Sequence, residues 1–315
     1  MAGAPVLAHL VRGGFIESVH RAVVAVTAAD GTVHKAWGAV DEPIFPRSAN
    51  KPIQALAMVR AGLRLEPRLL ALASASHSGE PFHQAAAGDI LAGAGLDLDH
   101  LQNTPSLPID AVERDRWIRE GLAPEAVAQN CSGKHAAMLA TCVVNGWDVA
   151  TYRDPGHPLQ QAIAATIADL AGEPVAATAV DGCGAPVMAI SLAGLARAFG
   201  RLGAAADGSP ERAVADAMRS HPEYVGGTGR DVTALMARTP GLVVKDGAES
   251  VYAVGLADGR GVAVKVVDGT PRAKPVILAA VLRSLGVESL AYEQLENSPV
   301  LGHGEPVGAL VAVGI

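Results

Sequence analysis

A serine and a lysine stand three residues apart in the stretch Arg47-Ser48-Ala49-Asn50-Lys51-Pro52, directly before a helical run of apolar residues. Residues at this spacing project from one face at the start of a helix, so we expect the Ser48 hydroxyl beside the Lys51 amine. An amine whose pKa is lowered by burial or by a nearby cation takes up the serine proton. Ser-x-x-Lys opening a helix is typical of serine–lysine hydrolases. The alternative is a capping serine followed by a solvated lysine.

Two further polar groups interrupt apolar patterns. The run Leu69–Ala75 leads into Ser76-His77-Ser78-Gly79-Glu80, which indicates the edge of a site or, alternatively, a serine-rich helix cap. Lys265 interrupts the apolar strand pattern over 261–267. If both faces of that strand are covered, the lysine must be paired or functional. A Gly-rich loop over 226–231 is expected to shape a pocket, with Arg230 facing a carboxylate.

Two passages place a cysteine beside glycine and polar residues, namely Asn130-Cys131-Ser132-Gly133-Lys134-His135 and Asp181-Gly182-Cys183-Gly184-Ala185-Pro186. Cys142, in contrast, lies in an apolar pattern typical of a core. The spacing of Cys131 and Lys134 places both on one helical face, as two ligands of one ion require. A lysine ligand must be neutral, which requires desolvation or the charge of the metal. Reduced thiols that line a pocket, or a nucleophilic Cys131, are the alternatives.

The composition excludes several classes of protein. The net charge is −7 and the pI about 5.8, without a Lys/Arg cluster, which argues against binding to nucleic acid. No apolar stretch approaches the roughly 18 residues of a membrane span. Three cysteines are an odd number and predict no disulfide framework, which favours a reducing compartment. No basic leader is seen at the N-terminus. We therefore expect a soluble, cytoplasmic protein.

The elements that must position these residues fall into three parts of the chain. Strand patterns cover residues 21–27, 32–37, 250–256, 261–267 and 307–313. Helical patterns cover residues 84–94, 134–144, 158–171, 190–199, 211–218, 231–236 and 275–285. Strands at both ends predict one α/β domain of the α+β type over 1–315. Its mainly antiparallel sheet comes from about 1–46 and 240–315 and is flanked by helices, with a helical region over about 51–238.

In their order along the chain, these stretches resemble the asparaginase II family, the rhizobial-type L-asparaginases with a serine β-lactamase/glutaminase-like fold. The resemblance is collinear over nearly the whole chain. It is carried by Gly13-Gly14, Glu17–Arg21, Arg47–Pro52, Ala75–Ser78, Asn130–His135, Thr178–Cys183, His221–Glu223 and Val264–Val266. The Ser-Asp-Asn and Lys-Thr-Gly motifs of β-lactamases are absent. Lys265 corresponds to the lysine of the Lys-Thr-Gly motif only by analogy of fold.

Position by position, the resemblance implies the site residues. Two serine–lysine pairs would share one pocket, Ser48 with Lys51 and Ser76 with Lys265. A zinc site would consist of Cys131, Lys134 and Cys183. Substrate binding would fall to Arg47, His135 and Asp181.

The implied activity is hydrolysis of the side-chain amide of L-asparagine to L-aspartate and ammonia, through a serine nucleophile that lysine activates. The family also implies a homodimer. The residues leave open which serine attacks, although Ser48 has its base three positions away. A glutaminase or another small-amide hydrolase of this fold is an alternative, because one methylene changes binding by only a few kcal/mol. A β-lactamase-like enzyme, for which a secretion signal is expected, and a non-catalytic asparagine-binding module are further alternatives.

Overall fold

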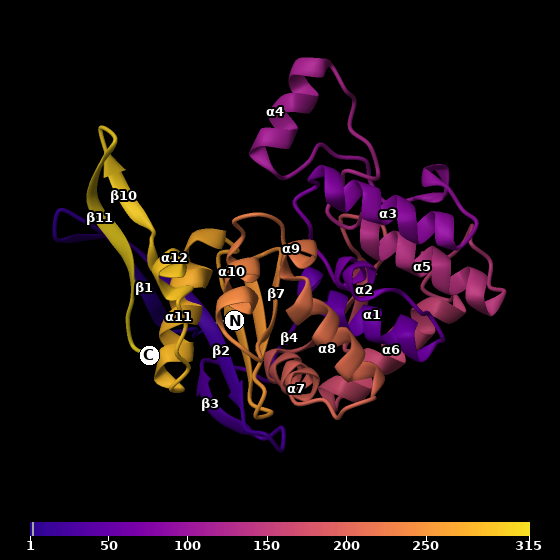
Figure 1. Ribbon diagram of the computed structural model, residues 1–315. Coiled ribbons are helices and arrows are strands. Elements are labelled where there is room, and N and C mark those ends of the chain that lie inside the picture. The colour runs from indigo at the N-terminus through magenta and orange to yellow at the C-terminus, as the bar shows by residue number, and fades with distance from the viewer. Residues whose placement is uncertain (2) are drawn as a thin grey trace.

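An eight-stranded antiparallel sheet, built from the two ends of the chain, is the framework of the molecule (Figure 1). The computed structural model describes Met1 and residues 3–315. The strands of this sheet are β1 (Val6–Arg12), β2 (Phe15–Thr27), β3 (Val33–Trp37), β7 (Val243–Gly247), β8 (Val251–Gly255), β9 (Gly261–Val266), β10 (Pro299–Gly302) and β11 (Glu305–Ala312). Their order is β10-β11-β1-β2-β9-β8-β7, and β3 also pairs with β2. The two ends of the chain therefore meet where β1 pairs with β11 and β2 with β9.

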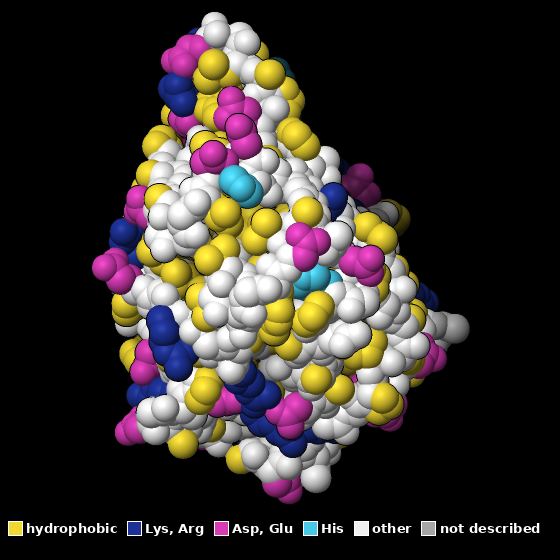
Figure 2. All heavy atoms as spheres, turned by 90° about the vertical axis from the view of Figure 1, so that its right-hand side faces the viewer, with side chains coloured by type: hydrophobic (Ala, Val, Ile, Leu, Met, Phe, Trp, Pro, Cys, Tyr) yellow, Lys and Arg dark blue, Asp and Glu magenta, His cyan; other side chains and the backbone are white. Residues whose placement is uncertain are grey.

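Helices fill most of the chain between β3 and β7 (Figure 1). They are the 3₁₀ turn η1 (Arg47–Asn50), α1 (Lys51–Arg60), α2 (Pro67–Ala73), α3 (Pro81–Gly93), η2 (Leu98–His100), α4 (Ala111–Glu120), α5 (Ser132–Asn145), α6 (Pro158–Ala171), α7 (Leu192–Gly203), α8 (Pro210–Ser220), α9 (Pro222–Val225) and α10 (Asp231–Arg238). After β9 follow η3 (Pro271–Ala273), α11 (Lys274–Ser284) and α12 (Tyr292–Glu296). On the helical side shown in Figure 2, acidic and basic side chains are interspersed with apolar ones.

Small residues let α7 pack directly on the sheet. β7, β8 and β9 are buried along their whole length, and α7 and α11 contact β8 and β9. A Cβ at Gly255 would lie 1.9 Å from the carbonyl oxygen of Phe199 in α7, and one at Gly261 would lie 1.8 Å from that of Ala196. Only glycine permits such an approach of helix to strand. The scarcity of aromatic residues thus fits a core of close backbone contacts and small aliphatic side chains.

The expected architecture, an antiparallel sheet from both ends with a helical region between them, is confirmed. The middle of the chain is not purely helical, however, because β4 (Pro43–Ile44), β6 (Pro186–Ser191) and β5 (Ala177–Val180) form a small sheet. The helix predicted over 190–199 therefore begins later than expected, because residues up to Ser191 belong to the buried strand β6 and α7 starts at Leu192. A short apolar run cannot be assigned to strand or helix by periodicity alone. In the described part of the chain, no helix is both long and apolar enough to cross a membrane.

Candidate active site

Ser48 is presented by a tight turn against the end of β7. Arg47, the residue before it, has φ 53°, a left-handed conformation that is unfavourable for a residue other than glycine. β7 runs so close to this turn that a Cβ at Gly247 would lie 2.4 Å from the carbonyl oxygen of Pro46. Because Gly247 has no side chain, β7 can contact this turn directly, and the contact helps to hold Ser48 in position.

Lys51, the first residue of α1, points to the second serine. Its side chain is 1% exposed, and Nζ lies 3.0 Å from Ser76 Oγ and 3.2 Å from the carbonyl oxygen of Asn130. Ser76 follows α2 and is held through its backbone N–H, which donates to the carbonyl of Val225 at 3.1 Å. In the part of the chain that the structure describes, the Ser48 hydroxyl makes no side-chain hydrogen bond. Lys51 is thus paired with Ser76 in this structure.

Both serines line one cavity of about 310 Å³. Asn130 also lines it, as do the end of β7 and the turn that follows this strand. The remaining lining residues come from the loop before α11, from the start of α11 and from the Gly-rich loop, and they are Gly269, Pro271, Lys274 and Arg230. The structure therefore brings Ser48 and Ser76 to one cavity, and Lys51 contacts Ser76 from behind its wall.

Lys265 does not reach Ser76. Its Nζ donates to the backbone carbonyl of Glu249, in the turn between β7 and β8. Burial lowers the pKa of the Lys265 amine. On β9, Lys265 lies opposite Val251 of β8, so its side chain is directed to that turn. The Ser76–Lys265 pair implied by the resemblance is therefore not formed, and Lys51 is the lysine at Ser76.

A buried charge cluster borders the cavity and was not anticipated from the sequence. Lys245 is fully buried, and its Nζ donates to Asp246 Oδ1 at 2.7 Å. Lys274 Nζ and Arg230 Nη2 contact the other carboxylate oxygen, Oδ2, at 3.3 and 3.2 Å. Burial acts to raise the pKa of Asp246, but the three cations outweigh it and lower that pKa strongly. The expectation that Arg230 faces a carboxylate is confirmed, and the carboxylate is that of Asp246.

The pKa of Lys245 is lowered to about 8, mainly by burial and further by the charge of Lys51, although Asp246 opposes the shift. A sequence signal for this residue existed. Lys245 directly follows an apolar run, Leu242-Val243-Val244, and the chain has only six lysines.

The two cysteines of the predicted metal site meet Lys134 in the interior. Lys134 Nζ lies 3.2 Å from Cys183 Sγ, and all three cysteines of the chain are free thiols. A hydrogen bond with Cys183, together with burial, raises the pKa of Cys131. The same hydrogen bond and the charge of Lys134 lower the pKa of Cys183 strongly. The Lys134 amine and the two sulfur atoms therefore form one buried polar cluster.

Cys131, Lys134 and Cys183 fit a zinc ion in donor type and in proximity, because two sulfur atoms and one amine nitrogen converge. The fit depends on the lysine. In the described residues, histidine, cysteine, aspartate and glutamate alone form no group of three that could hold a metal ion.

The residues predicted to bind substrate lie beside this cluster. Arg47 Nε and Nη2 both contact Asp181 Oδ1 at 2.8 Å, so Arg47 joins the Ser48 turn to the Cys183 loop. His135 is buried, its Nδ1 is 2.6 Å from the Tyr152 hydroxyl, and burial lowers its pKa to about 4. Neither Arg47, Asp181 nor His135 is among the residues that line the serine cavity.

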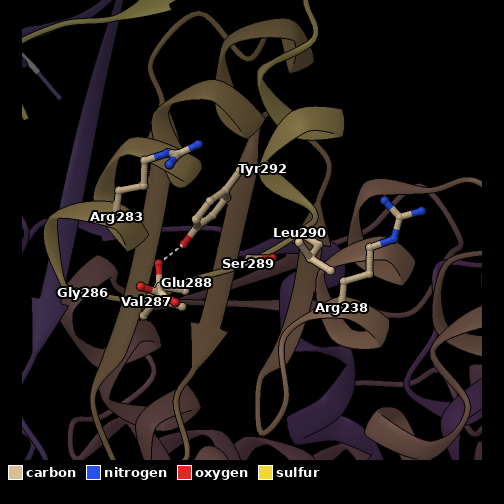
Figure 3. Close-up of a pocket in the computed structure, with 8 residues that line it drawn as sticks. All are labelled: Arg238, Arg283, Gly286, Val287, Glu288, Ser289, Leu290 and Tyr292. Atoms are coloured by element: carbon tan, nitrogen blue, oxygen red, sulfur yellow. Dashed lines mark hydrogen bonds between the residues drawn. The ribbon is translucent and has the colours of Figure 1, made fainter.

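A larger cavity, of about 610 Å³, lies beside α10, α11 and α12 (Figure 3). Arg238, Arg283 and Leu290 are in its wall, and the Tyr292 hydroxyl donates to the carbonyl of Val287 at 2.7 Å (Figure 3). Arg283 already pairs with Glu296 at 2.9 Å. This cavity contains no serine–lysine pair and is separate from the serine site.

Comparison with known proteins decides the family. A model of the family described as L-asparaginase II matches residues 8–312. The chain belongs to the L-asparaginase II family. Membership implies a hydrolase of the L-asparaginase type, with L-asparagine as the substrate. No curated protein matches the chain.

Solved structures show more distant similarity. A proposed beta-lactamase from Bacteroides dorei DSM 17855 is 16% identical, with a TM-score of 0.45 over 83% of this chain and 92% of that chain. Mglu in its native form at 4.3 M NaCl is 14% identical, with a TM-score of 0.48 over 86% of this chain and 62% of that chain. EstCE1, a hydrolase with promiscuous acyltransferase activity, is 13% identical, with a TM-score of 0.42 over 82% of this chain and 92% of that chain. The substrate class therefore rests on the family match.

Proposed function

We propose that this L-asparaginase II family member hydrolyses the side-chain amide of L-asparagine with Ser48 as nucleophile and Lys51 as base, the proton passing through Ser76. The observation that carries this proposal is the 3.0 Å contact between Lys51 Nζ and Ser76 Oγ, in the wall of the cavity that Ser48 also lines. In this proposal, a serine that contacts the base and lines the same cavity as the nucleophile relays the proton between them.

Two features favour Ser48 over Ser76 as the attacking residue. Ser48 is half-buried, lines the cavity and follows the strained Arg47, whereas Ser76 is only 5% exposed. Unfavourable backbone conformations concentrate at functional sites, where the fold holds a reactive group in a fixed position. In addition, the hydroxyl of Ser48 has no competing side-chain hydrogen bond in the described part of the chain.

The proposed reaction begins with Lys51 as the free amine. Ser48 Oγ forms a bond to the amide carbon while its proton moves to Ser76 Oγ, and the Ser76 proton moves to Lys51 Nζ. The carbon–nitrogen bond then breaks, and the proton returns along the same path to the nitrogen, which leaves as ammonia. Water attacks the resulting β-aspartyl ester on Ser48 and gives its proton to the same relay. The carbon–oxygen bond to Ser48 then breaks, the proton held by Lys51 returns through Ser76 to Ser48 Oγ, and L-aspartate leaves.

We further propose that Cys131, Lys134 and Cys183 would hold a zinc ion. When bound, zinc supplies positive charge and fixes its ligands in place. Arg47 and Asp181 connect this cluster to the Ser48 turn through their 2.8 Å ion pair. In this proposal, that ion pair keeps the turn in the orientation that directs Ser48 into the cavity.

Ammonia release from L-asparagine and L-glutamine tests the proposal. We expect wild-type protein to turn over L-asparagine, and Ser48→Ala to lower kcat by more than about a thousandfold. Ser76→Ala and Lys51→Met should each lower it by about 10²–10⁴, the range for a lost proton-transfer group. Ser284→Ala, which removes a hydroxyl bound to the carbonyl of Val281 within α11, is the matched control. Faster turnover of L-glutamine would make the protein a glutaminase, and turnover of neither amide would overturn the proposal.

A further inference from the structure

The amine of Lys51 contacts two segments that are far apart in the sequence. Its Nζ lies 3.0 Å from Ser76 Oγ and 3.2 Å from the carbonyl oxygen of Asn130. Ser76 follows α2, whereas Asn130 precedes α5. A positioned acid or base transfers a proton only within hydrogen-bond reach, so the proposed relay depends on how these two segments are held against each other.

His77, the residue after Ser76, forms a hydrogen bond at each ring nitrogen. Its Nδ1 accepts the backbone N–H of Gly79 at 3.1 Å, which assigns the proton of the neutral ring to Nε2. Nε2 lies 2.9 Å from Ser132 Oγ and therefore donates to it. Both side chains are fully buried, and neither lines the serine cavity. The ring of His77 therefore connects two parts of the protein without contacting the space where substrate would bind.

The surroundings of His77 keep its ring neutral and in one orientation. Burial lowers the pKa of His77 well below its usual value, and the nearby His83 and Lys51 act in the same direction. The rings of His77 and His83 are stacked, with their centroids 4.9 Å apart and 17° between their planes. His83 is itself held, because its Nε2 lies 2.9 Å from the carbonyl oxygen of Glu223. His77 is therefore a fixed hydrogen-bond donor.

Ser132 belongs to the segment that holds the other partner of the lysine amine. It is the first residue of α5 and follows Asn130 by two positions. The start of α5 lies directly against α2, since a Cβ at Gly133 would be 2.7 Å from the carbonyl oxygen of Leu72. The hydrogen bond to Ser132 therefore joins the same two segments that supply both partners of the lysine amine.

We infer that His77 is a positioning residue for the proton relay, because its bond to Ser132 fixes the Ser76 hydroxyl against the Lys51 amine. The inference rests on the proposed function and deepens it, since it assigns a role to a side chain that contacts no reacting atom. Loss of the Nε2–H leaves the buried Ser132 hydroxyl without this partner and lets the Ser76 segment move away from Asn130. The contact across which the proton passes then lengthens.

Substitutions at the two ends of this hydrogen bond test the inference. His77→Asn keeps an acceptor for the N–H of Gly79, but its side chain is too short to reach Ser132. We expect kcat for L-asparagine to fall roughly ten- to hundredfold and KM to stay within about twofold, because the cavity wall is unchanged. His77→Gln, whose amide nitrogen can take the place of Nε2, should recover most of the loss. Ser132→Ala should reproduce the fall, and the double variant His77→Asn/Ser132→Ala should be no slower than either single variant.

His157→Asn is the matched control. The Nδ1 of His157 accepts the N–H of Leu159 at 3.1 Å, and its Nε2 lies 3.0 Å from the carbonyl oxygen of Asp148, so this buried ring makes equivalent contacts at the start of α6. Its substitution should leave kcat unchanged. The inference is wrong if His77→Asn and Ser132→Ala keep the wild-type kcat, if His157→Asn loses as much, or if the losses in the double variant add.

Hydrogen exchange measured by mass spectrometry separates this inference from the proposed function, because it needs no substrate. In His77→Asn, the peptides that contain Ser76 and Asn130 should exchange faster than in wild type, and His157→Asn should not change them. If wild-type protein releases no ammonia but these peptides behave as expected, the proposed function fails and the positioning of Ser76 by His77 stands. If ammonia is released but exchange and kcat are unchanged in His77→Asn, the positioning role fails and the function stands.

Discussion

Lys51 Nζ lies 3.0 Å from the hydroxyl of Ser76, which is 25 residues further along the chain, although Ser48 is only three residues away. The first turn of α1 directs the lysine inward, where the carbonyl of Asn130 accepts a second hydrogen bond at 3.2 Å. Lys51 is therefore positioned by three separate segments of the chain. In the proposed mechanism, its pairing with a distant serine makes Ser76 part of the path by which a proton leaves Ser48.

Asp246 is predicted to be essential for stability. Asp246→Asn leaves Lys245, Lys274 and Arg230 without the carboxylate that compensates them, and breaking a buried ion pair in this way costs about 3–5 kcal/mol of unfolding free energy. Urea denaturation measures the loss. Asp89→Asn removes a carboxylate from an exposed pair with Arg68 and should cost less than about 1 kcal/mol. Equal losses in the two variants would show that the cluster is not held together by its charges.

Gly247→Ala is predicted to impair turnover more than stability. The new Cβ would lie 2.4 Å from the Pro46 carbonyl and must push β7 away from the turn that presents Ser48. A displacement of about 1 Å at a nucleophile lowers kcat by up to roughly a hundredfold. Gly88→Ala is the matched control, since a Cβ there has no atom within 4 Å, and in the middle of α3 it should stabilise by about 0.5–1 kcal/mol. Unchanged kcat in Gly247→Ala would show that this contact does not position the serine.

How much the sequence could predict differs between the fold and the site. The hairpin of residues 21–37 and the strands near the C-terminus follow from alternating apolar patterns and Gly-containing turns, and the structure has them as β2, β3, β8, β9 and β11. Strand β6 was not predicted, because its six residues are all buried and therefore show no alternation of apolar and polar residues.

The groups to which the lysine amines hydrogen-bond could not be predicted from residue spacing in the sequence. Lys51 and Lys265 were both identified as candidates, but which group each amine reaches depends on tertiary register. On β9, Lys265 lies opposite Val251, and its amine reaches the turn at Glu249 rather than Ser76. Lys245 carried a weaker signal than Lys265, because it ends a short apolar run and is followed by Asp246 and Gly247.

The sulfur cluster is predicted to retain zinc. Protein purified without chelator should contain about one equivalent of zinc per chain by elemental analysis, because two thiols and an amine converge at one point. Cys183→Ser should lose the metal, while Cys142→Ala should keep it, since that cysteine lies in the main core apart from the cluster. Full zinc content in Cys183→Ser would contradict the assigned ligands.

Unfolding free energy is predicted to fall in acid through His83. Burial lowers the pKa of His83 from 6.5 to about 4, so between these values the unfolded chain binds a proton that the folded protein excludes. The contribution of His83 to the free energy of unfolding is therefore fully present above pH 6.5. It declines as the pH falls towards 4, by at most about 1.4 kcal/mol for each pH unit. Urea denaturation across this range should show a smaller slope in His83→Gln than in wild type. An identical slope would assign the acid sensitivity to other groups.

The most direct measurement concerns the covalent intermediate. Protein mixed with L-asparagine and quenched in acid during turnover should gain the mass of one aspartyl group, and peptide mapping should locate it on Ser48. In Ser76→Ala the same adduct should form more slowly on the same residue, because the relay and not the nucleophile has been removed. An adduct on Ser76, or on Cys131, would contradict the assignment of Ser48 as the nucleophile.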